Sequence, residues 1–148
     1  MPDTVPPAII STRLIPFPRK AVFDAFGDPA RLVLWWGPNG FTNTIHEFEL
    51  RPGGRFHLTM HGPDAVSYEN HKEFLEVIEP ERVVFRHLQP MHDFTMTITW
   101  DEEAGGTRVT WKMAFESGSD GEKFRDFILK ANEENFDRLE AHLKKSTP

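Results

Sequence analysis

The chain has 148 residues, the length of one domain that buries about two-thirds of its unfolded surface. It carries 17 Lys and Arg against 23 Asp and Glu, and this net charge of −6 argues against a nucleic-acid or anionic-membrane surface. It contains no cysteine, which excludes disulfides and cysteine-based metal or nucleophile chemistry and fits a reducing compartment. With no secretory signal and no run of transmembrane length, we expect residues 1–148 to form a single cytoplasmic domain with a flexible leader at residues 1–7.

The first part of the chain predicts one strand followed by two short helices. Ala8–Ile15 alternates in side-chain character as a strand does, and two nearby prolines end it. A brief helix is predicted over Pro18–Ala25. A second short helix is expected to begin with Asp28 as its N-cap and a proline at its first position, to carry Trp35, and to end at Gly37.

From residue 41 onward, regularly spaced turn residues predict an antiparallel meander. The expected strands are Thr42–Leu50, Arg55–His61, Val66–Ile78, Arg82–Leu88, Phe94–Trp100 and Arg108–Phe115. Most alternate with a period of two and have one apolar face, so that one side lies on a core and the other in water.

Gly121–Lys145 has the only long helical pattern, with Ser119 or Asp120 as the expected cap. Its apolar side is formed by Phe124, Phe127, Ile128, Ala131, Leu139 and Leu143. Asn135 lies inside this stripe, within about 20° of Phe124 on the helical wheel. A buried amide needs a partner, since leaving it unpaired costs about 1–3 kcal/mol. Either a backbone group or a buried water pairs with Asn135, or Asn135 faces a cavity and meets a ligand. We expect the sheet to curl around this helix.

Six short segments spread over the chain carry a family signature. They are Arg13-Leu14-Ile15-Pro16, Val22-Phe23-Asp24-Ala25-Phe26, Trp35-Trp36-Gly37-Pro38, Arg51-Pro52-Gly53-Gly54-Arg55-Phe56, Pro80-Glu81-Arg82-Val83-Val84-Phe85 and Gly106-Thr107-Arg108-Val109. Together they resemble bacterial homologues of the activator of heat-shock-protein-90 ATPase (AHSA1-like proteins).

This resemblance implies the START-like (SRPBCC) superfamily and its α+β helix-grip fold. In that fold a curved antiparallel sheet of six to seven strands surrounds a long C-terminal helix, and two short helices follow the first strand. The resemblance also implies a cavity between helix and sheet, which relatives use for lipids, hormones, polyketides or other apolar molecules.

We therefore expect the protein to bind a small, largely apolar ligand in such a cavity, with no cofactor. The expected ligand-binding residues are Trp35, Phe56, Leu58, Tyr68, Phe85, Met96, Ile98, Trp111, Met113, Ile128, Asn135 and Leu139. The same bulky residues are also typical of a solid core, so an open and a filled cavity both agree with the sequence.

Two other functions stay open. An enzyme of the cyclase or aromatase kind would use Glu69 or His71 as a base, because the strand around them brings polar groups to both faces. A protein-binding module, in the manner of the chaperone activator, is the other. The sequence shows no counterpart of the chaperone-docking domain, so a chaperone partner is not predicted. The partners we expect are a small apolar molecule and a second copy in a homodimer, but no nucleic acid and no membrane.

The histidines invite a metal hypothesis, which their spacing disfavours. His57 and His61 share the polar face of one strand but lie too far apart to chelate one ion by themselves. His87 and His92 flank a loop and could converge, but the sequence indicates no third metal ligand near them. We expect no metal site. The chain also has no phosphate-binding Gly-rich motif and no nucleophile elbow, so no catalytic residue is predicted.

Overall fold

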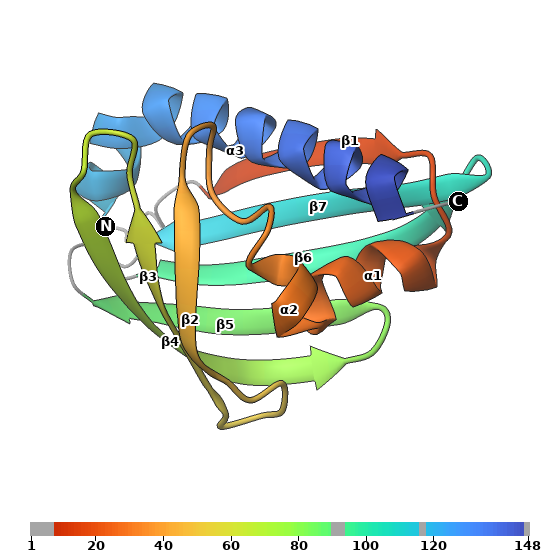
Figure 1. The fold of residues 1–148 in the computed structure, drawn as a ribbon, viewed down its shortest axis with the longest axis horizontal. Coiled ribbons are helices and arrows are strands. Elements are labelled where there is room, and N and C mark those ends of the chain that lie inside the picture. The colour runs from red at the N-terminus through yellow and green to blue at the C-terminus, as the bar shows by residue number, and fades with distance from the viewer. Residues whose placement is uncertain (1–7, 90–93, 116–117, 147–148) are drawn as a thin grey trace, which may run out of the picture.

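The computed structural model describes residues 8–89, 94–115 and 118–146, so the expected leader at residues 1–7 lies outside it. A curved antiparallel sheet wraps around one long helix (Figure 1). The elements in chain order are β1 (Ile9–Ile15), α1 (Arg19–Gly27), α2 (Pro29–Leu32), β2 (Thr42–Phe48), β3 (Arg55–His61), β4 (Ser67–Ile78), β5 (Arg82–Gln89), β6 (Phe94–Glu103), β7 (Gly106–Phe115) and α3 (Gly118–Ser146). The predicted helix-grip fold is confirmed.

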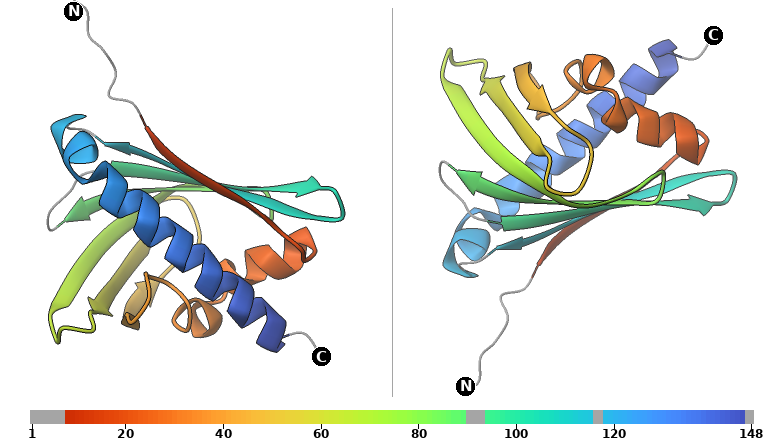
Figure 2. Two further views of the ribbon diagram at one scale, coloured as in Figure 1. Left: turned by 90° about the horizontal axis from the view of Figure 1, so that it is seen from above. Right: turned by 90° about the horizontal axis from the view of Figure 1, so that it is seen from below.

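The seven strands form one sheet in the order β1-β7-β6-β5-β4-β3-β2. All neighbouring strands are antiparallel. Figure 2 shows α3 running diagonally across the concave side of the sheet. The short helices α1 and α2 lie beside the C-terminal half of α3. No helix in the described part of the chain is long and apolar enough to cross a membrane.

The predicted second helix is shorter in the structure. Asp28 caps it as expected, since its Oδ1 accepts a hydrogen bond of 3.0 Å from the Ala30 N–H. The helix then ends at Leu32, and Trp35 lies in the turn that follows. The Asn43 side chain donates to the backbone carbonyl of Trp36 at 2.7 Å, so a contact from β2 holds this turn.

Aromatic side chains fill the end of the concave space that α1 covers. The rings of Phe56 and Phe74 are stacked with centroids 5.5 Å apart, and Phe23 meets Trp100 edge to face at 4.7 Å. These four residues are at most 2% exposed. The solid core therefore occupies one end of the sheet.

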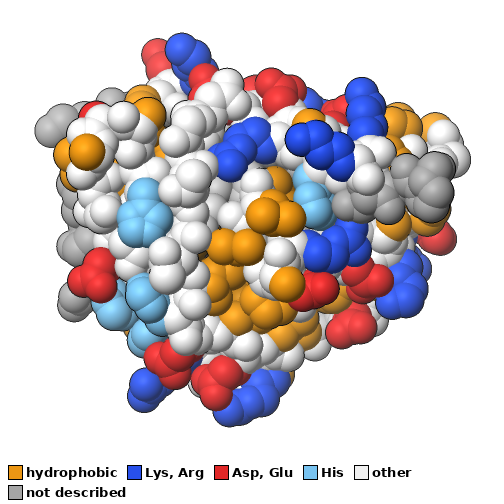
Figure 3. Space-filling view, in the orientation of Figure 1, with side chains coloured by type: hydrophobic (Ala, Val, Ile, Leu, Met, Phe, Trp, Pro, Cys, Tyr) orange, Lys and Arg blue, Asp and Glu red, His pale blue; other side chains and the backbone are white. Residues whose placement is uncertain are grey.

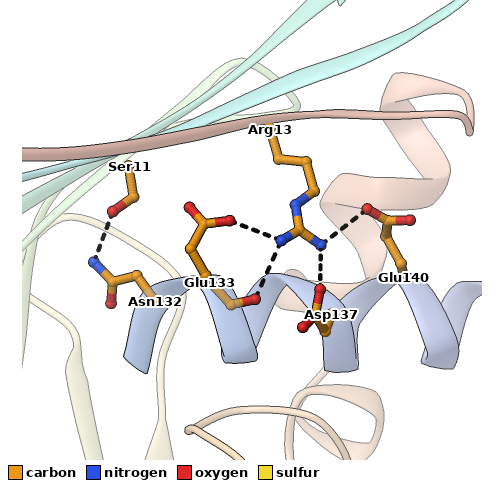
Figure 4. A network of polar contacts seen from close by, with 6 residues as sticks. All are labelled: Ser11, Arg13, Asn132, Glu133, Asp137 and Glu140. Carbon is orange, nitrogen blue, oxygen red and sulfur yellow. Dashed lines mark hydrogen bonds and ion pairs between the residues drawn. The ribbon is translucent and has the colours of Figure 1, made fainter. Parts of the chain in front are cut away.

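Arg13 on β1 fixes the position of α3 (Figure 4). Its guanidinium pairs with the carboxylates of Glu133 at 2.8 Å, Asp137 at 2.7 Å and Glu140 at 3.1 Å. It also lies 5.5 Å from the centre of the Phe136 ring. Burial opposes the charge, but hydrogen bonds to three carboxylates outweigh it and hold the pKa of Arg13 above its ordinary value. One side chain thus ties about two turns of the helix to the edge of the sheet.

One residue in the N-terminal half of α3 differs from the helical-wheel prediction. Phe127, expected on the buried side, is 71% exposed. The prediction that Ser119 or Asp120 caps the helix is wrong, because α3 begins at Gly118 and both residues lie in its first turn.

Candidate functional site

A cavity of about 450 Å³ lies between α3 and the concave face of the sheet. Its walls come from the loop before β2, from strands β3 to β7 and from α3. The volume falls within the range of small-molecule sites, about 300–1,000 Å³. The concave space is therefore solid beneath α1 and hollow beneath the first half of α3.

The residues predicted to bind a ligand divide into two groups. Those that line the cavity are Tyr68, Phe85, Met96, Trp111, Met113, Ile128 and Asn135. The structure places the others in the solid core, at most 2% exposed and outside the cavity wall: Trp35, Phe56, Leu58, Ile98 and Leu139. The Trp35 indole N–H donates to the Ala25 carbonyl at 2.9 Å, which holds its ring against α1.

Sequence reasoning missed Lys72, a charged side chain in the cavity wall that is only 3% exposed. Its Nζ lies 4.5, 4.9 and 5.1 Å from the ring centres of Phe56, Trp36 and Phe85. Within the described residues, no hydrogen bond or ion pair holds this ammonium group. Burial lowers the pKa of Lys72 to about 7. The alternation of side chains along a strand could have identified it, because Lys72 lies two residues before the apolar Phe74 and so shares its face.

The two residues proposed as catalytic bases, Glu69 and His71, lie on the opposite face of β4 from Lys72. Neither lines the cavity, and the His71 ring packs against the ring of His57 with centroids 4.5 Å apart. Their placement therefore does not support an acid–base role in this cavity.

The imidazole and the side-chain amides of the described cavity wall have hydrogen-bond partners. His87, which lies opposite Lys72 in the β4–β5 register, has its Nε2 3.2 Å from Asn70 Oδ1. On α3, the amide of Asn132 donates to Ser11 Oγ at 3.1 Å (Figure 4). Lys72 differs from these groups because, among the described residues, its ammonium group contacts three aromatic rings and makes no hydrogen bond.

Side chains of α3 fasten the loop that forms one wall. Asn135 Oδ1 accepts from the Gly37 N–H at 3.1 Å, and its Nδ2 donates to the Trp35 carbonyl at 2.9 Å. Arg138 donates to the carbonyls of Gly37 at 2.8 Å and of Phe41 at 2.9 Å. Asn135 is thus buried in the apolar stripe as predicted, and the backbone supplies its partners. Asn135 therefore positions the loop that forms this part of the cavity wall.

The histidines of the sheet's outer face gather over β2 to β4, where Figure 3 shows them in pale blue. His57 Nδ1 lies 3.0 Å from a Glu47 carboxylate oxygen, and His61 is hydrogen-bonded to hydroxyl groups of neighbouring strands. Burial, and then the neighbouring His71, lower the pKa of His57. No group of three or more potential metal ligands occurs among the described residues, and His92 lies outside them.

A curved antiparallel sheet that grips a long C-terminal helix above an internal cavity defines a START-like (SRPBCC) domain. Residues 16–144 match the family model described as Activator of Hsp90 ATPase homolog 1-like protein. The chain belongs to this AHSA1-like family. No curated protein matches the sequence.

Solved structures from several bacteria share the fold. A crystallised protein from Nitrosomonas europaea has a TM-score of 0.87 and 20% identity over 97% of this chain and 98% of its own. One from Mycobacterium smegmatis has a TM-score of 0.86 and 25% identity over 98% and 96%. The AHSA1 protein from Silicibacter pomeroyi has a TM-score of 0.78 and 20% identity over 95% and 99%.

Proposed function

We propose that this protein binds a small, largely apolar ligand in the cavity between α3 and the sheet. The observation that carries the proposal is the cavity itself, with a volume of about 450 Å³ and walls made mainly of apolar side chains. Burial of apolar ligand surface there would contribute roughly 25 cal/mol per Å². The few polar groups of the wall would fix the orientation of the ligand.

The composition of the wall supports an adaptable site. Three methionines, Met60, Met96 and Met113, line it. Methionine side chains are unbranched and polarisable, so they adjust to ligands of different shapes at little cost. We expect several related molecules to bind.

An entrance is supported by exposed aromatic groups at the rim. Phe127 is 71% exposed and Tyr68 is 38% exposed, yet both line the cavity. Large apolar side chains in water beside an apolar cavity are typical of a binding-site mouth. A ligand would enter between the first turns of α3 and the end of β4 that carries Tyr68. The cytoplasmic location and the homodimer stay predictions.

Filling the cavity tests this function. Ala131 on α3 lines the cavity, whereas Ala141 on the same helix is exposed. We expect Ala131→Trp to abolish binding because the indole would occupy the ligand's space, and Ala141→Trp to leave binding unchanged. The measurements are native mass spectrometry of the protein from its own host and thermal shifts against lipids, flavonoids and polyketides. An empty wild-type protein that no member of the panel stabilises would contradict the proposal.

A further inference from the structure

Among the described residues that line the cavity, Lys72 is the one that carries an ammonium group. The three rings that surround its Nζ belong to Phe56, Trp36 and Phe85, all at most 6% exposed. A buried charge is normally paired, because transfer out of water costs more than ring contacts return. Methionine would fill the same space without this cost. Among the described residues of the wall, the ammonium group therefore has aromatic neighbours but no paired acceptor.

No residue in the described part of the wall pairs with this ammonium group. Among the described residues that line the cavity there is no Asp and no Glu. The neutral acceptor Asn70 Oδ1 lies 3.2 Å from His87, and Asn135 Oδ1 accepts from the loop backbone. A ligand would therefore have to bring the acceptor with it. An ammonium group in low dielectric pairs most strongly with an anion, and a cationic ligand would be repelled.

We infer that the cavity selects an amphipathic carboxylic acid, whose carboxylate pairs with Lys72 while its apolar body lies against the methionines and extends towards the rim at Phe127. This inference rests on the proposed function and names the ligand class of the same site. Lys72 is 3% exposed whereas Phe127 is 71% exposed, so the charged end of the ligand would lie deep and its apolar end near the mouth.

A carboxylate ligand would change the protonation of the site. Burial lowers the pKa of Lys72 to about 7, so about half of the empty molecules carry the charge at neutral pH. A bound carboxylate favours the ammonium form, so binding takes up a proton and affinity falls as pH rises above 7. The other titratable groups in the described wall are Tyr68 on β4 and His87 on β5, while α3 presents the neutral amides of Asn132 and Asn135.

Probes that differ only in their head group test the inference. We would measure dissociation constants at pH 7 for dodecanoate, dodecanol and dodecylamine, using quenching of tryptophan fluorescence, since Trp36 and Trp111 line the cavity. The pair 2-naphthylacetate and 2-(2-naphthyl)ethanol covers aromatic ligands. We expect the dissociation constant of each acid to be lower than that of its alcohol by a factor of about ten or more. The amine should bind most weakly.

Two variants identify the residue responsible. Lys72→Met should abolish the preference, so that the alcohol binds at least as tightly as the acid. Lys112→Met, at an exposed position on β7, should keep it. Binding of dodecanol or the naphthyl alcohol to Lys72→Met would show that the variant retains a folded cavity.

The outcomes separate the two proposals. If acid and alcohol bind alike to the wild type, or if Lys72→Met keeps the preference, the inference is overturned and the apolar binding function stands. If no probe of any charge binds, the proposed function itself fails and the inference fails with it.

Discussion

Replacing Lys72 with methionine should stabilise the empty protein. The pKa of Lys72 is about 7 in the folded state against an ordinary 10.5. At about 1.4 kcal/mol per pKa unit, the buried charge costs up to about 5 kcal/mol near neutral pH. Three ring contacts offset part of this, about 0.5–1 kcal/mol each. We therefore expect Lys72→Met to raise the free energy of unfolding by about 2–3 kcal/mol at pH 7.

The sign of the pH dependence provides a second test. Between pH 7 and about 10.5 the unfolded chain holds a proton on Lys72 that the folded chain has lost, so this residue makes wild-type stability rise with pH. The methionine variant lacks this contribution. The stability difference between variant and wild type should therefore be largest below pH 7 and shrink as pH rises towards 10.

Urea unfolding followed by circular dichroism at pH 6, 7, 8.5 and 10 measures both effects, with Lys112→Met as the exposed control. The control should follow the wild type at every pH. A Lys72→Met variant that is less stable than wild type throughout, or whose stability difference does not depend on pH, would refute the reasoning. Either result would mean that the ammonium group has a partner.

Two further substitutions test how α3 holds the site. Asn135→Leu should lower the free energy of unfolding by about 1–3 kcal/mol, because the Gly37 N–H and the Trp35 carbonyl lose their buried partner. Hydrogen exchange at the Gly37 amide should accelerate, and unchanged exchange there would count against this role. Arg13→Met should lower stability by about 1 kcal/mol, since two of the three paired carboxylates are more than half exposed. Thermal unfolding at low and high salt should show a loss that shrinks with salt; a salt-independent loss would contradict the ion-pair account.

Periodicity predicted the strands and the long helix, and the family resemblance implied the helix-grip fold that they form. Strands such as Arg55–His61 coincide with their predicted bounds, because an apolar face on one side and turn residues at both ends leave little choice. The second short helix was predicted too long for a physical reason. Local residues permit a helix through Trp35, but side chains from β2 and α3, Asn43 and Asn135, bind the backbone of the turn instead. Local preference yields to such tertiary contacts.

The cavity wall could be predicted only in part. Alternation identifies the inner face of each strand, and Met96 and Ile98 both lie on the inner face of β6. Only Met96 lines the cavity, while Ile98 lies in the solid core. Which inner residues meet the hollow depends on how the sheet curves and where α1 packs. Phe127 illustrates the same limit, since a helical wheel cannot show where the surface beneath the helix ends.

Lys72 was missed because two local rules conflict on β4. A lysine between polar neighbours predicts a solvated face, whereas its phase with Phe74 predicts the core. A register shift in the β4–β5 pairing between His71 and Lys72 sets Lys72 opposite His87, with both side chains on the concave side. Sequences that specify a fold well avoid such conflicts except where function requires them. A lysine kept inside a ring of aromatic side chains, with no acceptor in the described wall, is therefore better explained by what the cavity binds than by the stability of the sheet.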